Sequence, residues 1–312
     1  MELRSPIRVR VPASSANLGP GFDVLALALG LYLRCTLRES GAGFAVRVSG
    51  TDSAAISLDE SNLVWRAFLR LAGERAPRGV ELQIANEIPI GKGLGSSAAA
   101  IVAGLALANE WMGLKKSKEE IVQLAAEMEG HPDNVAAAVW GGLVASCQAE
   151  DGSVLSVRSP LSANVEVVLV VPEFELPTEA ARAALPAQYS RQDAVFNLQR
   201  VALLLAALRD GRADLLAEGM RDRLHQPYRA PLVPGFEAIL ELRDLPGLLG
   251  VALSGAGPSV LAFCSGHSAE VGEAIAACFR AKKIAAQAHR LPVDRDGLAV
   301  ERLAWQSEPR LP

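Results

Sequence analysis

The sequence has few cysteines and none in clusters, which excludes two kinds of stabilising site. Its four cysteines, Cys35, Cys147, Cys264 and Cys278, lie far apart, and no CxxC pair occurs. This spacing fits neither a zinc site nor a disulfide framework, and instead favours small buried thiols in a reducing compartment. Runs of Lys and Arg are also missing, and the formal net charge is −4. The chain therefore offers no electrostatic surface for nucleic acid.

Long apolar runs are missing as well. The longest uncharged stretch, residues 93–109, is rich in Ala, Gly and Ser and is shorter than the ~20 strongly apolar residues that cross a bilayer. Residues 1–12 alternate apolar and basic side chains like a strand and contain no secretory apolar region. We therefore expect a cytoplasmic protein without a membrane span. With 50% hydrophobic and 21% charged residues, the chain is expected to be a soluble globular protein, and its 312 residues are enough for two domains, with one large domain as the alternative.

Residue patterns predict a mixed α/β first half and a split βαβ second half. Strands are expected at 7–11, 31–39, 44–50 and 80–89, and helices at 62–74, 96–109 and 118–129. The second half begins with a buried strand at 165–172 and helices at 178–185 and 193–208. Residues 248–293 then give strand, glycine turn, strand, helix and strand, the order of a split βαβ sandwich. We place the domain boundary near residue 160, which gives domains 1–160 and 161–312.

One segment, PIGKGLGSSAAA at residues 89–100, concentrates small residues at the start of the uncharged helix: Gly91, Gly93, Gly95, Ser96 and Ser97. Three glycines within five residues cost backbone entropy unless the chain turns sharply or something approaches it closely. Two interpretations are about equally supported. Main-chain N–H groups at the helix N-terminus form a phosphate cradle, or the segment is a tight strand-to-helix turn capped by serine. Lys92 could add positive charge, although a solvated lysine is the commoner outcome.

Better-known glycine motifs do not fit this segment. The P-loop pattern GxxxxGK[ST], the dinucleotide pattern GxGxxG and the hydrolase pattern GxSxG are all absent. Two further loops of small residues follow predicted strands, PASSANLGPGFD at 12–23 and SGAGPS at 254–259. Each alone is more often a turn than a binding site. Together, the three loops and a buried helix predict a nucleotide cleft.

These three motifs, in this order, resemble those of the GHMP kinases, named for galactokinase, homoserine kinase, mevalonate kinase and phosphomevalonate kinase. The resemblance covers residues 7 to about 290. The middle motif marks the superfamily, whereas SSANLGPGFD (14–23) and EGHPDNVAAAVWGG (129–142) resemble the homoserine kinase branch. The implied fold is α+β, with an N-terminal α/β domain that forms a βαβ nucleotide cleft and a C-terminal ferredoxin-like split βαβ domain.

The reaction implied by the resemblance is ATP-dependent phosphorylation of the L-homoserine hydroxyl, which gives O-phospho-L-homoserine for threonine biosynthesis. Two other functions stay open. One is a mevalonate- or sugar-type kinase of the same superfamily, and the other is a sensor of the same fold that binds ligand without turnover. The sequence also leaves the oligomeric state open, a homodimer included.

The resemblance implies that ATP and Mg²⁺ bind along the glycine-rich segment. Its nucleotide-binding residues would be Asn62, Pro89, Ile90, Gly91, Lys92, Gly93, Leu94, Gly95, Ser96, Ser97, Ala98 and Ala99. Ser97 and Glu129 would hold Mg²⁺, a hard cation that takes few protein ligands and several waters. Glu127 is the neighbouring alternative, and Glu129 is favoured because it directly precedes GHPDN. Without a nucleotide role, Asn62 would be a helix cap.

A homoserine site needs an anion for the ammonium group, a clamp for the carboxylate and polar groups near the hydroxyl. The resemblance implies Asp23 for the ammonium group. It implies Arg182 and Arg229 for the carboxylate, because guanidinium offers paired donors. The remaining substrate residues would be Asn17, His131, Asn134 and Thr178.

The catalytic residues implied are Glu129, Asn134 and Ser97, without a dedicated base. Asn134 stands where some relatives carry an aspartate base, so the hydroxyl proton is expected to leave to a phosphate oxygen or to water. Asp133 is a weaker candidate base. Three further histidines are expected to be structural: His225, His267 and His289.

Overall fold

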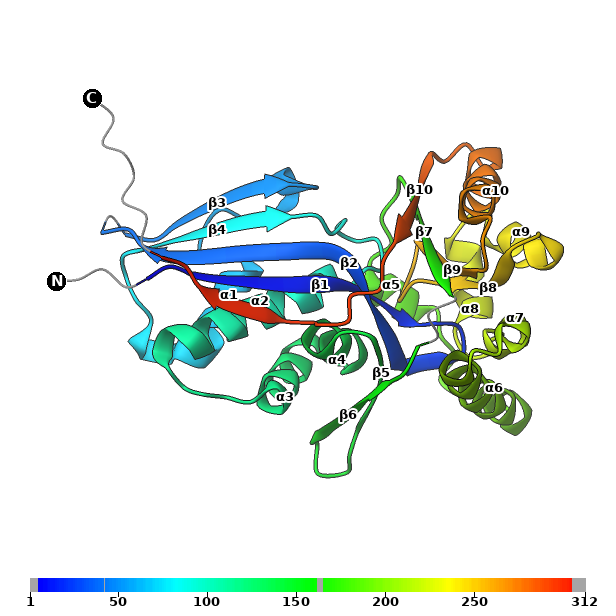
Figure 1. Cartoon of the computed structure of the whole chain (residues 1–312), viewed down its shortest axis with the longest axis horizontal. Helices are drawn as coiled ribbons and strands as arrows, with labels where there is room; N and C mark the ends of the chain where they lie inside the picture. The colour runs from blue at the N-terminus through cyan, green and yellow to red at the C-terminus, as the bar shows by residue number, and fades with distance from the viewer. Residues whose placement is uncertain (1–4, 42, 162–164, 305–312) are drawn as a thin grey trace.

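Two β-sheets, each with helices packed against it, make up the computed structural model (Figure 1), which describes residues 5–41, 43–161 and 165–304. The first sheet has the order β11-β1-β2-β4-β3, and the β5-β6 hairpin joins it through β2. Its strands are β1 (Ile7–Asn17), β2 (Gly21–Glu39), β3 (Ala45–Gly50), β4 (Val80–Asn86), β5 (Leu143–Gln148), β6 (Val154–Ser159) and β11 (Ala299–Arg302). Strands β3 and β4 are parallel and flank a helix, which forms the expected βαβ unit.

The helices of the first half cover one face of this sheet (Figure 1): α1 (Leu63–Ala72), α2 (Ser96–Met112), α3 (Lys118–Glu129) and α4 (Asp133–Trp140). Helix α2 packs against α1, α3 and β1 and buries most of its residues, as its uncharged sequence predicts. Gly104 permits the close approach of α1, because a Cβ there would lie 2.1 Å from the Val64 carbonyl oxygen. Among the described residues, no helix is both long and apolar enough to span a membrane.

The second sheet has the order β10-β7-β9-β8, with all neighbours antiparallel. Its strands are β7 (Glu166–Pro172), β8 (Leu248–Leu253), β9 (Val260–Cys264) and β10 (Ala286–Leu291). Between β7 and β8 the chain forms α5 (Thr178–Ala183), α6 (Arg191–Asp210), α7 (Leu216–Gly219), α8 (Gln226–Arg229) and α9 (Phe236–Leu240), and α10 (Ser268–Ala281) joins β9 to β10. Numbered along the chain, the strands lie in the order 4-1-3-2. The predicted α+β fold with a ferredoxin-like second half is confirmed.

Several strands differ from their predicted positions. Strand β2 begins at Gly21 rather than at residue 31, and β4 ends at Asn86 rather than at 89. Strands β5, β6 and β11 and helix α4 were not predicted. Because β11 pairs antiparallel with β1, residues 299–302 complete the first sheet although they follow the second domain in the chain. The division at residue 160 stays a prediction.

Candidate active site

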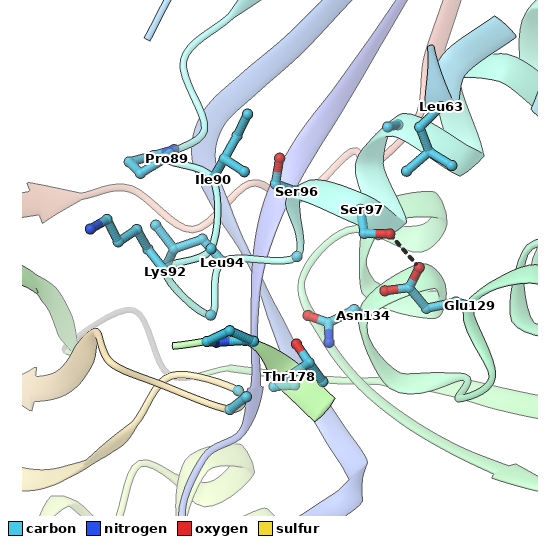
Figure 2. A pocket seen from close by; sticks show the side chains of 18 of the residues that line it. Leu63, Pro89, Ile90, Lys92, Leu94, Ser96, Ser97, Glu129, Asn134 and Thr178 are labelled. Carbon is cyan, nitrogen blue, oxygen red and sulfur yellow. Dashed lines mark hydrogen bonds between the residues drawn. The ribbon is translucent and has the colours of Figure 1, made fainter. Parts of the chain in front are cut away.

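A cavity of about 430 Å³ collects the three loops of small residues. Its walls come from the end of β1, the start of β2, the glycine loop (residues 89–95), the first turn of α2, the 129–134 segment, α5 and the 255–256 turn. Figure 2 shows that the glycine loop and α2 form one side, with Glu129 and Asn134 facing them. Segments far apart in the sequence therefore converge on a single cavity.

The glycines of the loop are required by backbone conformation and by close packing. Gly91, Gly93 and Gly95 have φ angles of 68°, 74° and 65°, which side chains rarely permit. A Cβ on Gly93 would lie 2.1 Å from the Ser254 carbonyl oxygen, and one on Gly95 would lie 2.2 Å from the Ser14 hydroxyl. The Ser254 hydroxyl also donates to the Gly93 carbonyl oxygen at 2.7 Å. The glycine loop is thus held between the two other loops.

Consecutive main-chain N–H groups of this loop lack a protein partner. Within the part of the chain that the structure describes, the N–H groups of residues 91–98 donate to no protein acceptor, whereas Ile90 N donates to Asp52 and Ala99 N to Gly95. Every helix leaves about four N–H groups unpaired at its start, so this run extends beyond the helix itself. The alternative interpretation, a turn capped by serine, is wrong in its cap, because the N-cap of α2 is Gly95, which has no side chain to accept a bond.

Ser97 and Glu129 both line the cavity, and their side chains point toward each other (Figure 2). The Ser97 hydroxyl, in the first turn of α2, donates to Glu129 Oε2 at 2.8 Å. Burial raises the pKa of Glu129, although the Ser97 hydroxyl and the His131 charge act in the opposite direction. The alternative carboxylate, Glu127, bonds to Gln123 and approaches Arg70 instead, and it does not line the cavity. The geometry therefore favours Glu129 as the candidate metal ligand.

The short segment after α3 places three polar side chains in the wall. His131 Nδ1 lies 2.7 Å from Asp133 Oδ1, and Asn134 Oδ1 accepts a bond from the Ser14 hydroxyl at 2.8 Å. Burial acts to lower the pKa of His131, but its hydrogen bond to Asp133 and the charge of that carboxylate raise it. The Asp133 carboxylate also accepts the Asn134 N–H at 2.7 Å.

An ion pair and a strained loop form the other end of the cavity. Asp23 accepts two hydrogen bonds from the Arg182 guanidinium, at 2.8 and 3.0 Å. Asn17 Oδ1 accepts the Asp23 N–H at 3.1 Å, and Asn17 Nδ2 donates to the Gly255 carbonyl oxygen at 2.8 Å. Asn17 and Asp23 both have positive φ angles, 72° and 56°. Such backbone strain clusters at functional sites.

Arg229 is the largest fully buried side chain described, at 1% exposure, and it lines the same cavity. Its Nε donates to the Ala181 carbonyl oxygen, and its Nη1 lies 3.2 Å from both the Gly255 carbonyl oxygen and His225 Nδ1. Burial, together with the nearby charge of Arg182, lowers the pKa of Arg229 to about 10. The side chain still carries its charge at neutral pH.

Most of the residues predicted for the site line this cavity, and four nucleotide candidates have another role. Ala98 and Ala99 are buried in the core behind it. Asn62 lines the cavity and also caps α1, because its Oδ1 accepts from Val64 N and Trp65 N. Lys92, expected to be solvated, donates from Nζ to the Phe174 carbonyl oxygen and points away from Ser97 (Figure 2).

The sequence did not single out several other lining residues: Phe22, Ala55, Ile56, Ser57, Ser61, Gly255 and Ala256. The last two lie in the SGAGPS loop, and Phe22 lies in PASSANLGPGFD, so the motifs contained the signal. Residues 55–61 carry no motif, and nothing in the sequence marked them.

A buried helix that opens on unpaired N–H groups, beside a carboxylate and a charged pair, suits a phosphate group next to a small charged ligand, as a kinase of small molecules requires. The chain matches the family descriptions "GHMP kinases N terminal domain" over residues 62–142 and "GHMP kinases C terminal" over residues 204–281. The homoserine kinase of Solibacter usitatus is 47% identical over 296 residues, 94% of this chain and 97% of that protein. The homoserine kinase of Desulfitobacterium hafniense is 46% identical over 298 residues, which cover 94% and 99% of the two chains.

Solved structures agree. The crystal structure of homoserine kinase from Cytophaga hutchinsonii is 31% identical with a TM-score of 0.83, and the match covers 96% of this chain and 99% of that one. The L. major mevalonate kinase, at 18% identity and a TM-score of 0.65, shares the fold. The chain belongs to the GHMP kinase family and, within it, to the homoserine kinases.

Proposed function

We propose that this protein transfers the γ-phosphoryl group of ATP to the side-chain hydroxyl of L-homoserine, giving O-phospho-L-homoserine for threonine biosynthesis. One observation carries the proposal. The same cavity joins seven consecutive unpartnered N–H groups, those of residues 91–97, to an Asp23–Arg182 pair that matches the two charges of an amino acid. A mevalonate- or sugar-type substrate carries no ammonium group for Asp23.

The glycine loop is suited to the triphosphate of ATP. Unpaired N–H groups and the positive end of a helix favour bound phosphate. In related sites, each donor aimed at developing charge contributes about 3–4 kcal/mol to the transition state. The nucleotide-binding residues proposed are those of the sequence prediction except Ala99, which is buried and whose N–H is bonded to the Gly95 carbonyl oxygen, and Ala98 would contribute its main-chain N–H alone. Asn62 and the residues around it line the cavity near the loop and are assigned to the nucleoside end.

Ser97 and Glu129 would hold Mg²⁺. The donor set fits this ion, because a hydroxyl and a carboxylate 2.8 Å apart leave room for waters and phosphate oxygens. No cluster of three or more His, Cys, Asp or Glu side chains able to hold a metal occurs in the described ranges, so a fully protein-bound metal has no support there. When bound, the ion would neutralise phosphate charge. A nearby cation would also favour the ionised form of Glu129, which burial disfavours.

The substrate would lie between the ion pair and the glycine loop. Its ammonium group would replace Arg182 beside Asp23, and its carboxylate would bind Arg182 and Arg229. Asn17, Asn134, His131 and Thr178 line the cavity nearby and would orient the chain and its hydroxyl. We propose that no side chain acts as a base. The Asn134 amide cannot accept a proton at neutral pH, and Asp133 already accepts bonds from His131 and from Asn134 N–H.

The test is a coupled assay of ADP release with L-homoserine, mevalonate and galactose as acceptors. Fast turnover of L-homoserine alone supports the proposal, and equal rates or no homoserine turnover reject it. Nucleotide binding by calorimetry without a phosphorylated product in mass spectrometry would instead identify the non-catalytic sensor. We also assign the protein to the cytoplasm, which agrees with its four unpaired cysteines.

A further inference from the structure

Arg229 is held by a row of buried polar side chains that the proposed function has not used. His225 Nδ1 faces Arg229 Nη1 at 3.2 Å, and His225 Nε2 lies 2.7 Å from the Gly19 carbonyl oxygen. The Asp222 carboxylate lies behind it, with Oδ2 3.6 Å from His225 Nε2. The side chains of Asp222 and His225 are both fully buried.

The bonding partners determine which ring nitrogen of His225 carries the proton. A guanidinium can only donate, so Nδ1 must accept from Arg229 and is unprotonated. A carbonyl oxygen can only accept, so Nε2 must donate to Gly19. Burial lowers the pKa of His225, in opposition to the charge of Asp222. The ring is therefore a neutral Nε2–H tautomer in a single orientation.

Asp222 is fixed in turn by four donors from the surrounding chain. Its two oxygens accept bonds from the main-chain N–H groups of Leu224, His225 and Gln226, at 2.9, 3.0 and 2.6 Å. Asn197 Nδ2 donates the fourth bond at 2.7 Å. Because this carboxylate is saturated by local donors, it sets the turn before α8 and the position of the histidine.

Because His225 is a neutral acceptor, it leaves the positive charge of Arg229 in place, which a carboxylate partner would not do. Among the described residues, no carboxylate lies within 4.0 Å of the Arg229 guanidinium, whereas Arg182 is paired with Asp23. His225 thus fixes the orientation of Arg229 without neutralising its charge. Phe22 adds to this restraint, since its ring stacks on His225 at 5.3 Å and Arg229 lies 5.2 Å from the ring centroid.

We propose that His225 is a positioning residue for the substrate carboxylate. It holds the Arg229 guanidinium in the cavity wall with no carboxylate of the described residues within 4.0 Å, and the carboxylate of the bound amino acid supplies a counter-charge at contact distance. The inference rests on the proposed function, since it assumes that Arg229 contacts the substrate.

Two variants of similar shape separate the two hydrogen bonds of the His225 ring, the one to Arg229 and the one to Gly19. His225→Asn keeps an acceptor where Nδ1 lies, and His225→Gln keeps a donor where Nε2 lies. We expect His225→Gln to raise the KM for L-homoserine about tenfold or more and His225→Asn to raise it far less, with the KM for ATP unchanged in both. The exposed His289→Gln is the control and should match wild type. Equal effects of the two variants on the homoserine KM, or none, would overturn the proposal.

The experiment distinguishes a failure of the proposed kinase function from a failure of the positioning role of His225. If wild type does not phosphorylate L-homoserine, the proposed function fails before any variant is compared. If wild type is active and neither variant folds, as judged by thermal unfolding, ¹⁵N spectroscopy of the wild-type histidines decides. An Nε2–H tautomer of His225 that persists from pH 6 to 9 supports the positioning role. A proton on Nδ1 would show that the ring cannot accept from Arg229 and would refute it.

Discussion

Replacing Arg182 should separate substrate binding from folding. In the free protein Arg182 makes a bidentate pair with Asp23, but the two side chains are 37% and 34% exposed. Pairs this exposed contribute only about 0–1 kcal/mol to stability, because water screens them and ordering two side chains offsets the attraction. Arg182→Ala should therefore shift the unfolding midpoint only slightly.

The effect on the substrate should be much larger. In the proposed complex the carboxylate would bind Arg182 in the cavity, where hydrogen bonds to a charged group contribute about 1.5–3 kcal/mol. Loss of about 2–3 kcal/mol raises the KM for L-homoserine by about 30- to 150-fold, at 1.4 kcal/mol per factor of ten. The KM for ATP should stay within about twofold, because the hydrogen bonds that the structure gives Arg182 go to Asp23 and not to the glycine loop. Steady-state kinetics with each substrate varied in turn measures both constants.

A matched control exists on the surface. Arg212 makes a bidentate pair with Asp214 at 2.9 and 2.7 Å, and both side chains are more than half exposed, outside the cavity. Arg212→Ala should leave both Michaelis constants at their wild-type values. Arg182→Lys, which keeps the charge and loses the paired donors, should lie between wild type and Arg182→Ala. An unchanged homoserine constant in Arg182→Ala would remove this residue from the substrate site.

Three other outcomes test the site. Glu129→Gln should abolish most activity yet stabilise the ligand-free protein. Because burial raises the pKa of Glu129, the stability that this group contributes falls as the pH rises from its ordinary pKa to the raised one. Melting curves of the variant, recorded across this pH range, should lack that decline. Gly93→Ala should destabilise the protein by about 2–6 kcal/mol, about 1–3 from the positive φ and a similar amount from overlap with the Ser254 carbonyl oxygen, and a wild-type urea midpoint would contradict this. Chelation with EDTA should stop turnover without unfolding the protein, and activity that is restored by adding Mg²⁺ would show that the reaction needs this ion, whereas turnover that persists in EDTA would contradict it.

The sequence predicted the elements that are marked by one continuous uncharged or apolar run. The absence of charge from 93 to 109 identified α2, and the apolar run 165–172 identified β7. The first part of β2, residues 21–30, was missed because residues 25–29 are all buried, between the paired strands β1 and β5 and beneath α4, so the sequence does not alternate. Strand β11 has four exposed residues and no apolar pattern, and only its pairing with β1 makes it a strand.

The site shows the same division between local and long-range information. Its main-chain donors depend on a local glycine pattern, so the sequence could place them. The role of His225 depends on a bond to Gly19, which is 206 positions away, and no local pattern contains that distance. The partner of Lys92 was likewise set by a loop of the second sheet, at Phe174.

The free site leaves several groups in states that a ligand would improve. Among the described residues, the N–H groups of residues 91–98 lack acceptors and Arg229 has no carboxylate within 4.0 Å, and burial disfavours the charged form of Glu129. Each matches one part of the proposed complex: phosphate oxygens, a cation and a carboxylate. A merely structural strand-to-helix turn would have no reason to leave all three unsatisfied around one cavity, since buried polar groups are normally paired. The same mismatch explains why changes that remove activity here, such as Glu129→Gln, should leave a more stable protein.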